Sequence, residues 1–130
     1  MLVALSLAAC SGPYVAQYED GVATNYANIA KVRLGMTRAE LDDVMGHREI
    51  VRYKRVVLNN PQRTESFRVR PDLLVDIVYY VTQGYVWQGP DDSHALTPVI
   101  LENGIVVGWG WGFLGRNRDR YVIEGVPPRP

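Results

Sequence analysis

Hydrophobic positions in the first half of the chain recur with the period of a helix. Thr37 is followed three residues later by Glu40, and such a pair forms a capping box in which each side chain accepts a hydrogen bond from the other residue's backbone N–H. We therefore predict that a helix begins at Arg38 and ends at Gly46, because glycine suits the backbone conformation that terminates helices. The apolar face of this helix consists of Leu41, Val44 and Met45.

A second short helix is predicted upstream. Ile29 and Val32 are spaced for one helical face, which predicts a helix from about Tyr26 to Arg33, and Gly35 supplies a break between the two helices. Each helix is too short to be stable alone in water, so both must lie on an apolar surface. Residues 10–25 precede them, and the stretch from Ser11 to about Thr24 shows neither helical nor strand periodicity. We interpret it as a tether.

After Gly46 the apolar positions alternate with a period of two, which indicates strands. Glu49–Leu58 predicts an edge strand, since it carries basic residues on both faces. Leu73–Val81 has the clearest alternation and is predicted to be a central strand. The segment Gln62–Asp72 between them is either a loop or an irregular strand that ends at Pro71.

A hairpin is predicted around Asn103 and Gly104, the pair that best fits a two-residue type I′ turn. It joins the strands Pro98–Glu102 and Ile105–Trp111. The expected register places Leu101 opposite Val106, Ile100 opposite Val107, and Val99 opposite Gly108. Gly108 and Gly110 leave one face of the last strand without side chains, so a helix could lie close against it. From Gly115 the sequence is charged and then proline-rich, and we interpret residues 116–130 as a loosely attached tail.

This order of elements predicts an α+β fold. We expect two short N-terminal helices packed on a three- to four-stranded antiparallel sheet, as a two-layer sandwich that spans residues 26–115. About 105 residues remain after the N-terminal segment, which is enough for one domain and too few for two.

The first ten residues, MLVALSLAAC, form an apolar run that ends in the chain's only cysteine. The run from Leu7 to Cys10 resembles a bacterial lipobox, in which small residues precede a cysteine that is diacylated. The resemblance implies that residues 1–9 are a signal peptide and that lipid on Cys10 anchors the protein in a membrane. The alternative is an N-terminal strand with a buried thiol. No Lys or Arg precedes the run and it is short for a signal peptide, so we expect the true start to lie upstream.

The same resemblance implies a location. Ser11 follows the cysteine, where inner-membrane lipoproteins carry aspartate, so the outer membrane is expected, with the domain facing the periplasm. No run reaches the roughly twenty apolar residues of a transmembrane helix.

Charge and titratable residues favour a binding protein over an enzyme. Fourteen basic and fourteen acidic residues give a formal net charge of zero, which disfavours nucleic acid as a partner. The only histidines, His47 and His94, have no spacing typical of a metal site, and we expect no cofactor and no catalytic residues. Two groups of acidic residues are alternatives for a hydrolytic or cation site, but we favour a solvent-exposed role for both. They are Asp91 and Asp92 with His94, and Glu40 with Asp42 and Asp43.

Aromatic and basic residues supply the candidate binding sites. We predict that Tyr85, Trp87, Trp109 and Trp111 bind a protein partner, since exposed aromatics dominate such contacts. Core packing is the alternative for Trp109 and Trp111. Arg63, Arg68 and Arg70 surround Phe67 and are candidates for contacts with anionic lipid headgroups, although a solvated loop is the commoner meaning of such a segment.

The segment Ile29–Gly46, IAKVRLGMTRAELDDVMG, resembles the signature of the BamE family, also called SmpA/OmlA. The matching positions are Ile29, Val32, Gly35, Met36, Thr37, Leu41 and Gly46. The second half is closer still to an uncharacterised lipoprotein branch with a BamE-like domain, through Thr97, Pro98, Asn103, Gly104, Gly108, Trp109 and Gly110. His47 departs from the family pattern, in which proline commonly follows the glycine, and the Asn59–Asp72 segment has no obvious counterpart.

The resemblance implies two helices on a three-stranded sheet and a role as an accessory subunit of the outer-membrane β-barrel assembly machine. BamE-type proteins contact partner lipoproteins, the barrel and phosphatidylglycerol. We therefore expect a non-catalytic, protein-binding envelope lipoprotein that acts in outer-membrane protein assembly or envelope integrity. The alternatives are a module that binds anionic lipid or peptidoglycan, and a periplasmic protein inhibitor of the β-lactamase-inhibitor type, which shares this fold.

Overall fold

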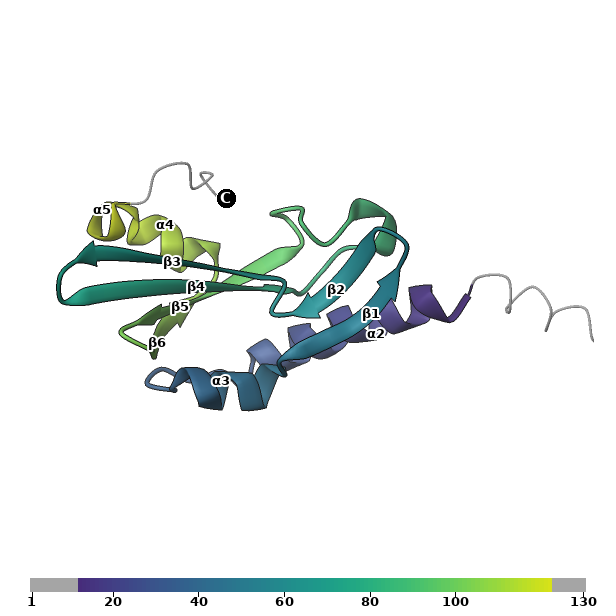
Figure 1. The fold of residues 1–130 in the computed structure, drawn as a ribbon, viewed down its shortest axis with the longest axis horizontal. Coiled ribbons are helices and arrows are strands. Elements are labelled where there is room, and N and C mark those ends of the chain that lie inside the picture. The colour runs from purple at the N-terminus through teal and green to yellow at the C-terminus, as the bar shows by residue number, and fades with distance from the viewer. Residues whose placement is uncertain (1–11, 123–130) are drawn as a thin grey trace, which may run out of the picture.

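Two antiparallel β-sheets lie at the centre of the molecule (Figure 1). The computed structural model describes residues 12–122. The smaller sheet pairs β1 (Arg48–Tyr53) with β2 (Val56–Asn60). The larger sheet has the order β3-β4-β5-β6 and consists of β3 (Arg63–Arg70), β4 (Leu73–Val81), β5 (Leu96–Glu102) and β6 (Ile105–Trp109). The predicted α+β class and the inner position of β4 are confirmed, and the 63–70 segment is a strand.

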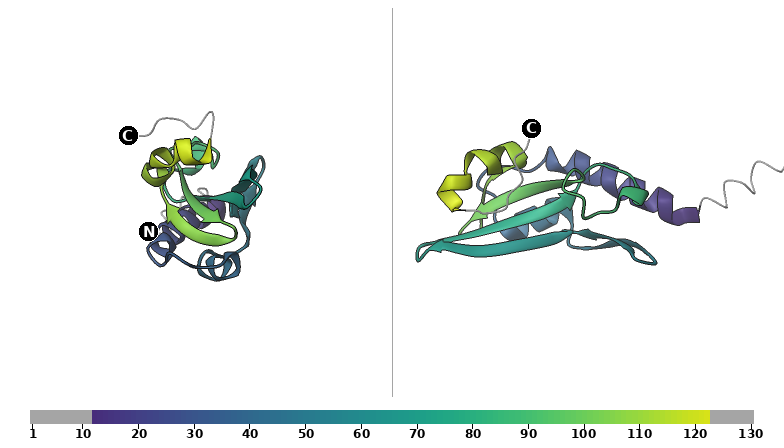
Figure 2. Two further views of the ribbon diagram at one scale, coloured as in Figure 1. Left: turned by 90° about the vertical axis from the view of Figure 1, so that its left-hand side faces the viewer. Right: turned by 90° about the horizontal axis from the view of Figure 1, so that it is seen from above.

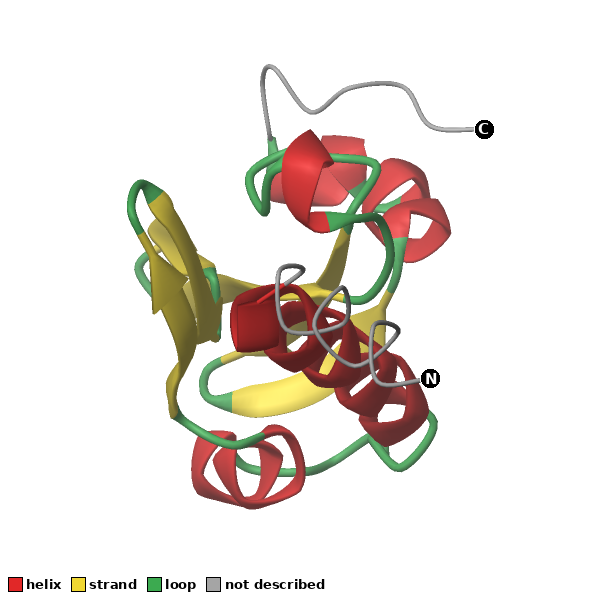
Figure 3. Ribbon diagram, turned by 90° about the vertical axis from the view of Figure 1, so that its right-hand side faces the viewer, coloured by secondary structure: helices red, strands yellow, loops and turns green. Residues whose placement is uncertain are grey.

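Helices lie on both faces of the larger sheet, as Figure 2 and Figure 3 show. On one face lies α3 (Arg38–Met45), and on the other lie α4 (Trp111–Arg116) and α5 (Arg118–Tyr121). The long helix α2 (Gly12–Ile29) runs beside the smaller sheet, and the 3-10 turn η1 (Val86–Gln88) belongs to the connection between β4 and β5. The prediction of two short helices on one face was therefore wrong in its arrangement, since helices cover both faces.

The alternating side chains of β4 contribute to two hydrophobic cores, which explains why both faces are covered. A strand that is buried on both faces is apolar almost throughout, as LLVDIVYYV is. The core beneath α4 and α5 includes Leu73, Val75, Ile77, Tyr79, Leu114 and Tyr121. The core above α3 includes Leu41, Met45, Val78, Tyr80, Leu101 and Val106.

The capping box predicted for α3 is present. The Thr37 hydroxyl accepts from the Glu40 backbone N–H at 3.2 Å, and the Thr37 N–H donates to the Glu40 carboxylate at 3.1 Å. Gly46 ends the helix with φ of 85°. The segment before α3 pairs with the outer edge of β6, because Val106 donates to the Met36 carbonyl at 2.8 Å and accepts from the Gly35 N–H at 2.9 Å. These bonds hold α3 against the sheet.

The predicted tether is wrong, because residues 12–25 are part of α2. The same helix ends at Ile29, so the predicted helix from Tyr26 to Arg33 is only its last turn and the loop beyond. Four buried residues lie at helical spacing on one side of α2, but two of them are not apolar, which hid the pattern. They are Tyr18, Gly21, Val22 and Asn25. Gly21 lets α2 approach the smaller sheet closely, since a Cβ there would lie 2.8 Å from Ile50 Cγ2.

A buried amide pair joins α2 to three other elements. Asn25 and Asn60 exchange two hydrogen bonds of 2.8 Å through their side-chain amides. Asn25 also donates to the Val81 carbonyl at the end of β4, and Asn60 donates to the Met45 carbonyl at the end of α3. The pair therefore fixes α2, β2, α3 and β4 relative to one another.

The predicted single strand from Glu49 to Leu58 is a hairpin. The chain turns at Lys54, which has a φ of 55°, and β1 and β2 pair so that Tyr53 lies opposite Val56. Neither Gly, Asn nor Pro stands in this turn, so the sequence carries none of the usual turn signals there. Lys54 occupies a left-handed conformation that non-glycine residues seldom adopt.

The predicted turn at Asn103 and Gly104 is present, with φ of 50° and 81° at the two positions. Leu101 lies opposite Val106 as predicted, but a β-bulge at the next step shifts the register. Ile100 therefore lies opposite Gly108, and Val99 lies opposite Trp109. The predicted pairings of Val99 with Gly108 and Ile100 with Val107 are wrong for this reason.

The expected close approach of a helix to the glycine face of β6 occurs at Gly108. A Cβ on Gly108 would lie 2.4 Å from two ring carbons of Phe113, which belongs to α4. The strand ends at Trp109 rather than Trp111, because the chain turns at Gly110 with φ of 91° and starts α4.

The predicted loose tail is wrong for residues 116–121, which continue α4 and form α5. Tyr121 is 1% exposed, and its hydroxyl donates to Glu102 at 2.6 Å. Arg120 forms an ion pair with the same carboxylate at 2.6 Å. Glycine-rich and charged residues hid the apolar spacing between Leu114 and Tyr121. Residues 123–130 lie outside the described part.

Four buried tyrosines predict a loss of stability at high pH. Burial raises the pKa of Tyr18, Tyr79, Tyr80 and Tyr121, and an accepting carboxylate, Glu65 or Glu102, raises the pKa of Tyr79 and Tyr121 further. Below about pH 10 these tyrosines are protonated in both the folded and the unfolded protein. As the pH rises above about 10, their hydroxyls lose protons in the unfolded protein first. We therefore expect the free energy of unfolding to fall as pH rises above about 10, by up to about 1.4 kcal/mol per pH unit for each tyrosine.

Urea unfolding at a series of pH values measures this loss. Tyr79→Phe should be less stable at neutral pH, where the bond to Glu65 is lost, and should show a shallower decline above pH 10. If stability declined above pH 10 as steeply in Tyr79→Phe, Tyr80→Phe and Tyr121→Phe as in the unsubstituted protein, groups other than these three would be its cause.

Candidate binding groove

An open groove lies where the last turn of α2 approaches the end of the larger sheet. Its volume is about 480 Å³, within the range of ligand-binding hollows. The last turn of α2, the start of β5 and the turn from β6 into α4 supply most of its walls. The lining residues are Tyr26, Ile29, Ala30, Thr82, Gln83, His94, Leu96, Thr97, Trp109, Gly110 and Trp111.

The two tryptophans of the groove differ in how firmly they are held. Trp111 is partly buried, its indole N–H donates to the Leu96 carbonyl at 2.8 Å, and its ring lies 5.9 Å from that of Tyr79. Trp109 is 36% exposed at the end of β6. Gly110 turns the chain between them, and both residues line the one groove.

Polar side chains also line the groove. The hydroxyls of Thr82 and Thr97 share a hydrogen bond of 2.6 Å, and the Gln83 amide donates to the His94 carbonyl. The ring of His94 lies 3.2 Å from the Asp92 carboxylate and is 71% exposed. The groove therefore presents apolar and aromatic walls beside a few groups that can exchange hydrogen bonds with a partner.

The other predicted aromatics lie elsewhere. Tyr85 and Trp87 are 53% and 74% exposed, and their rings stack with centroids 4.7 Å apart. Trp87 lines a different hollow, which shares no lining residue with the groove. The sequence therefore identified exposed aromatics at two separate surfaces.

The three predicted lipid-binding arginines are not brought together. Arg63 lies at the start of β3, with its guanidinium 4.5 Å from the centre of the Tyr79 ring. Arg68 and Arg70 lie at the other end of the strand, roughly 16–23 Å away at 3.3 Å per residue. Arg68 donates to the Pro71 carbonyl and Arg70 forms an ion pair with Asp72. They do not form one headgroup site.

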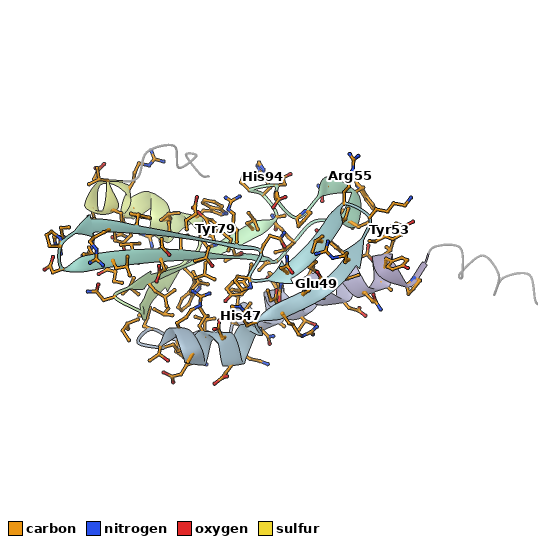
Figure 4. All side chains as sticks on the ribbon, in the orientation of Figure 1. His47, Glu49, Tyr53, Arg55, Tyr79 and His94 are labelled. Carbon is orange, nitrogen blue, oxygen red and sulfur yellow. The ribbon has the colours of Figure 1, made fainter. Side chains whose placement is uncertain are left out.

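Several of the candidate hydrolytic or cation-binding residues form local contacts. Asp42 pairs with Arg38 at 3.2 Å and lies 3.5 Å from the ring of His47. Glu40 serves the capping box. The two histidines lie far apart across the molecule (Figure 4). Within residues 12–122, no three His, Cys, Asp or Glu side chains are grouped for metal binding.

The remaining predictions concern the N-terminus. Cys10 and the signal peptide predicted for residues 1–9 lie outside the described residues. Within residues 12–122, none of the helices has the length and apolar character needed to cross a membrane.

Sequence reasoning missed the contribution of α2 to the groove. The sequence pattern places Ile29 on the apolar face of a short helix and Tyr26 at its start, whereas in the structure both line the groove and Tyr26 is 72% exposed. Thr97 stands out in the sequence only as part of a motif. The pairing of Thr82 with Thr97 follows from the β4–β5 register, which places Tyr80 opposite Thr97, and that register was not predicted.

Together these features define a small α+β protein with an aromatic-lined surface groove. A family model described as "Protein of unknown function (DUF3192)" matches residues 5–113 of the 130-residue chain, so the chain belongs to this family. No curated protein and no solved structure matches the chain.

Proposed function

We propose that this protein is a non-catalytic, lipid-anchored protein of the cell envelope that binds a partner protein through the groove. The observation that carries the proposal is the pair of indoles at one groove wall. Trp111 is held by its bond to Leu96, and Trp109 leaves about a third of its surface open beside it. Tryptophan is among the residues most enriched where a few side chains dominate protein–protein binding energy.

The groove is suited to an apolar segment of a partner. Ile29, Leu96 and the two indoles offer apolar contact, while Thr97, Gln83 and His94 can exchange hydrogen bonds with the partner's backbone or side chains. The lining residues carry no fixed charge, so a strongly charged partner segment would lose solvation without gaining an ion pair there.

Support for the class of partner comes from the sequence. The resemblance of Ile29–Gly46 to BamE, together with the lipobox at Cys10, favours the outer membrane facing the periplasm and a subunit of the barrel-assembly machine as partner. Ile29 belongs both to this motif and to the groove. The proposed role is accessory, in outer-membrane protein assembly or envelope integrity.

Trp109→Ala is expected to weaken partner capture at least about tenfold, since a central tryptophan contributes about 2 kcal/mol or more to such interfaces. The measurement is affinity capture by full-length protein from detergent-solubilised bacterial envelopes, with quantification of each co-purifying envelope protein. Detergent removes the bilayer, so only protein contacts are read.

Trp87→Ala is the matched control, because it removes a more exposed tryptophan outside the groove. It should leave capture unchanged. Equal effects of the two substitutions, or no effect of Trp109→Ala on any captured protein, would contradict binding through the groove.

A further inference from the structure

A second surface lies at the end of the molecule where α2 begins. Tyr14 and Tyr53, 40% and 42% exposed, stack with ring centroids 4.3 Å apart. Tyr85 and Trp87 form a second stacked pair with exposures of 53% and 74%. We call these four residues the aromatic patch. Exposed aromatics concentrated in this way mark an interaction surface rather than ordinary surface scatter.

The members of the patch come from three elements that meet at this end. Tyr14 belongs to the first turn of α2, Tyr53 to the β1–β2 hairpin, and Trp87 to η1. A hollow of about 330 Å³ lies between these elements and is lined by Tyr14, Val15, Tyr53, Val56, Val86 and Trp87. Figure 4 shows Tyr53 and Arg55 at the end of the long axis from which α2 starts. The surface is therefore aromatic and aliphatic.

Two basic residues stand beside the patch at the hairpin tip. Lys54 and Arg55 are exposed, and Lys54 Nζ lies 5.2 Å from the centre of the Tyr53 ring. Among the described residues, neither forms an ion pair with an acid, whereas the nearby Arg52 pairs with Glu49 at 2.8 Å. The left-handed backbone of Lys54, with φ of 55°, would be less costly for glycine.

The helix α2 begins at this same end of the molecule. Its first residue, Gly12, lines the hollow, and only Ser11 separates it in sequence from Cys10, the residue proposed to carry the lipid anchor. A bilayer that holds this anchor must therefore come close to the aromatic patch, and this step rests on the proposed lipid anchoring.

We propose that the aromatic patch, with Lys54 and Arg55, docks on the surface of a phospholipid bilayer that contains anionic lipid. Tyr and Trp are the residues that prefer the headgroup level, because each combines an apolar ring with a polar group. Lysine and arginine beside them attract anionic headgroups. The docked domain stands with its long axis away from the bilayer. This contact is separate from the proposed protein-binding groove and does not depend on it.

The three tryptophans of the chain provide the test. Full-length protein that carries Trp109→Phe and Trp111→Phe retains only Trp87, and its fluorescence is measured in vesicles of phosphatidylcholine with phosphatidylglycerol. We expect brominated lipids to quench Trp87 strongly, and acrylamide in the water to quench it less than without vesicles. The control retains only Trp109, through Trp87→Phe and Trp111→Phe, and should respond to acrylamide but hardly to brominated lipid.

Substitution at the hairpin tip tests the electrostatic part. Lys54→Gly with Arg55→Gln should reduce the docked-to-undocked ratio roughly tenfold or more in anionic vesicles, and little in neutral ones. Lys54→Gly should not lower the thermal midpoint, because glycine fits the backbone there. The proposal is overturned if lipid quenching is equal for Trp87 and Trp109, or if the protein does not attach to the vesicles. Either failure would leave the groove proposal unaffected, because that is read in detergent.

Discussion

Gly108→Ala is expected to destabilise the domain by about 1–3 kcal/mol, the usual range for overpacking a filled core. The added methyl group would lie 2.4 Å from two ring carbons of Phe113, and a third ring carbon is 2.7 Å away. Phe113 packs on the core that contains Leu114 and Tyr121, so its ring cannot move aside without displacing α4. Urea unfolding measures the change in free energy.

The double variant Gly108→Ala with Phe113→Ala should lose less stability than the sum of the two single losses, because the added methyl group no longer meets the Phe113 ring. Gly115→Ala is the control, and it is expected to increase the stability of the domain. It lies in the same helix with nothing within 4 Å of its added Cβ, and alanine is favoured over glycine in helices by up to about 1 kcal/mol. Additive effects of Gly108→Ala and Phe113→Ala would contradict the close approach of α4 to β6.

Asn25→Ala is expected to cost about 2–4 kcal/mol. The change removes three hydrogen bonds at once. The Asn60 amide keeps only its bond to the Met45 carbonyl, and the Val81 carbonyl loses its bond from Asn25. Each buried polar group that loses its partner costs about 1–3 kcal/mol. The loss should also loosen the attachment of α2, because this pair joins the helix to β2 and β4.

Asn28→Ala, one turn further along α2 and only partly buried, is the matched control and should cost well under half as much. The double change Asn25→Ala with Asn60→Ala should be less destabilising than the sum of its parts, because both single changes remove the same two hydrogen bonds between the amides. An Asn25→Ala variant as stable as Asn28→Ala would contradict this role of the pair.

The elements that were predicted well carry strong local signals. Thr37 and Glu40 fixed the start of α3, and the Asn103–Gly104 pair fixed the tip of the last hairpin, because each signal needs only neighbouring residues. The alternation of β4 identified a central strand. In each case local preference and tertiary packing agree.

The elements that were missed depend on contacts far apart in sequence. The buried face of α2 contains Gly21, which allows close packing on Ile50, and Asn25, which forms hydrogen bonds with Asn60. Neither looks like a core residue when the sequence is read alone. The β1–β2 turn uses Lys54 without a turn residue. The bulge in β6 falls immediately before Gly108, and although glycine within a strand often marks a bulge, it does not show in which direction the register shifts.

The groove could be predicted from the sequence only in part. Trp109 and Trp111 were identified as individual interface candidates, and the expected helix next to Gly108 was found in α4. Their assembly into a groove required the last turn of α2 to reach the end of the sheet, and the irregular helix pattern concealed this. Tyr85 and Trp87 were grouped with them by residue type, but they face a different surface.

The central claim is that the groove binds a protein in the envelope. The most direct measurement is site-specific photocrosslinking in bacterial cells, with a photoreactive phenylalanine in place of Trp109 in the full-length protein. The control probe replaces Arg68, which is exposed on β3 outside the groove. We predict one defined envelope protein crosslinked at position 109 and absent at position 68. No protein adduct at 109, or the same adducts at both positions, would contradict the claim.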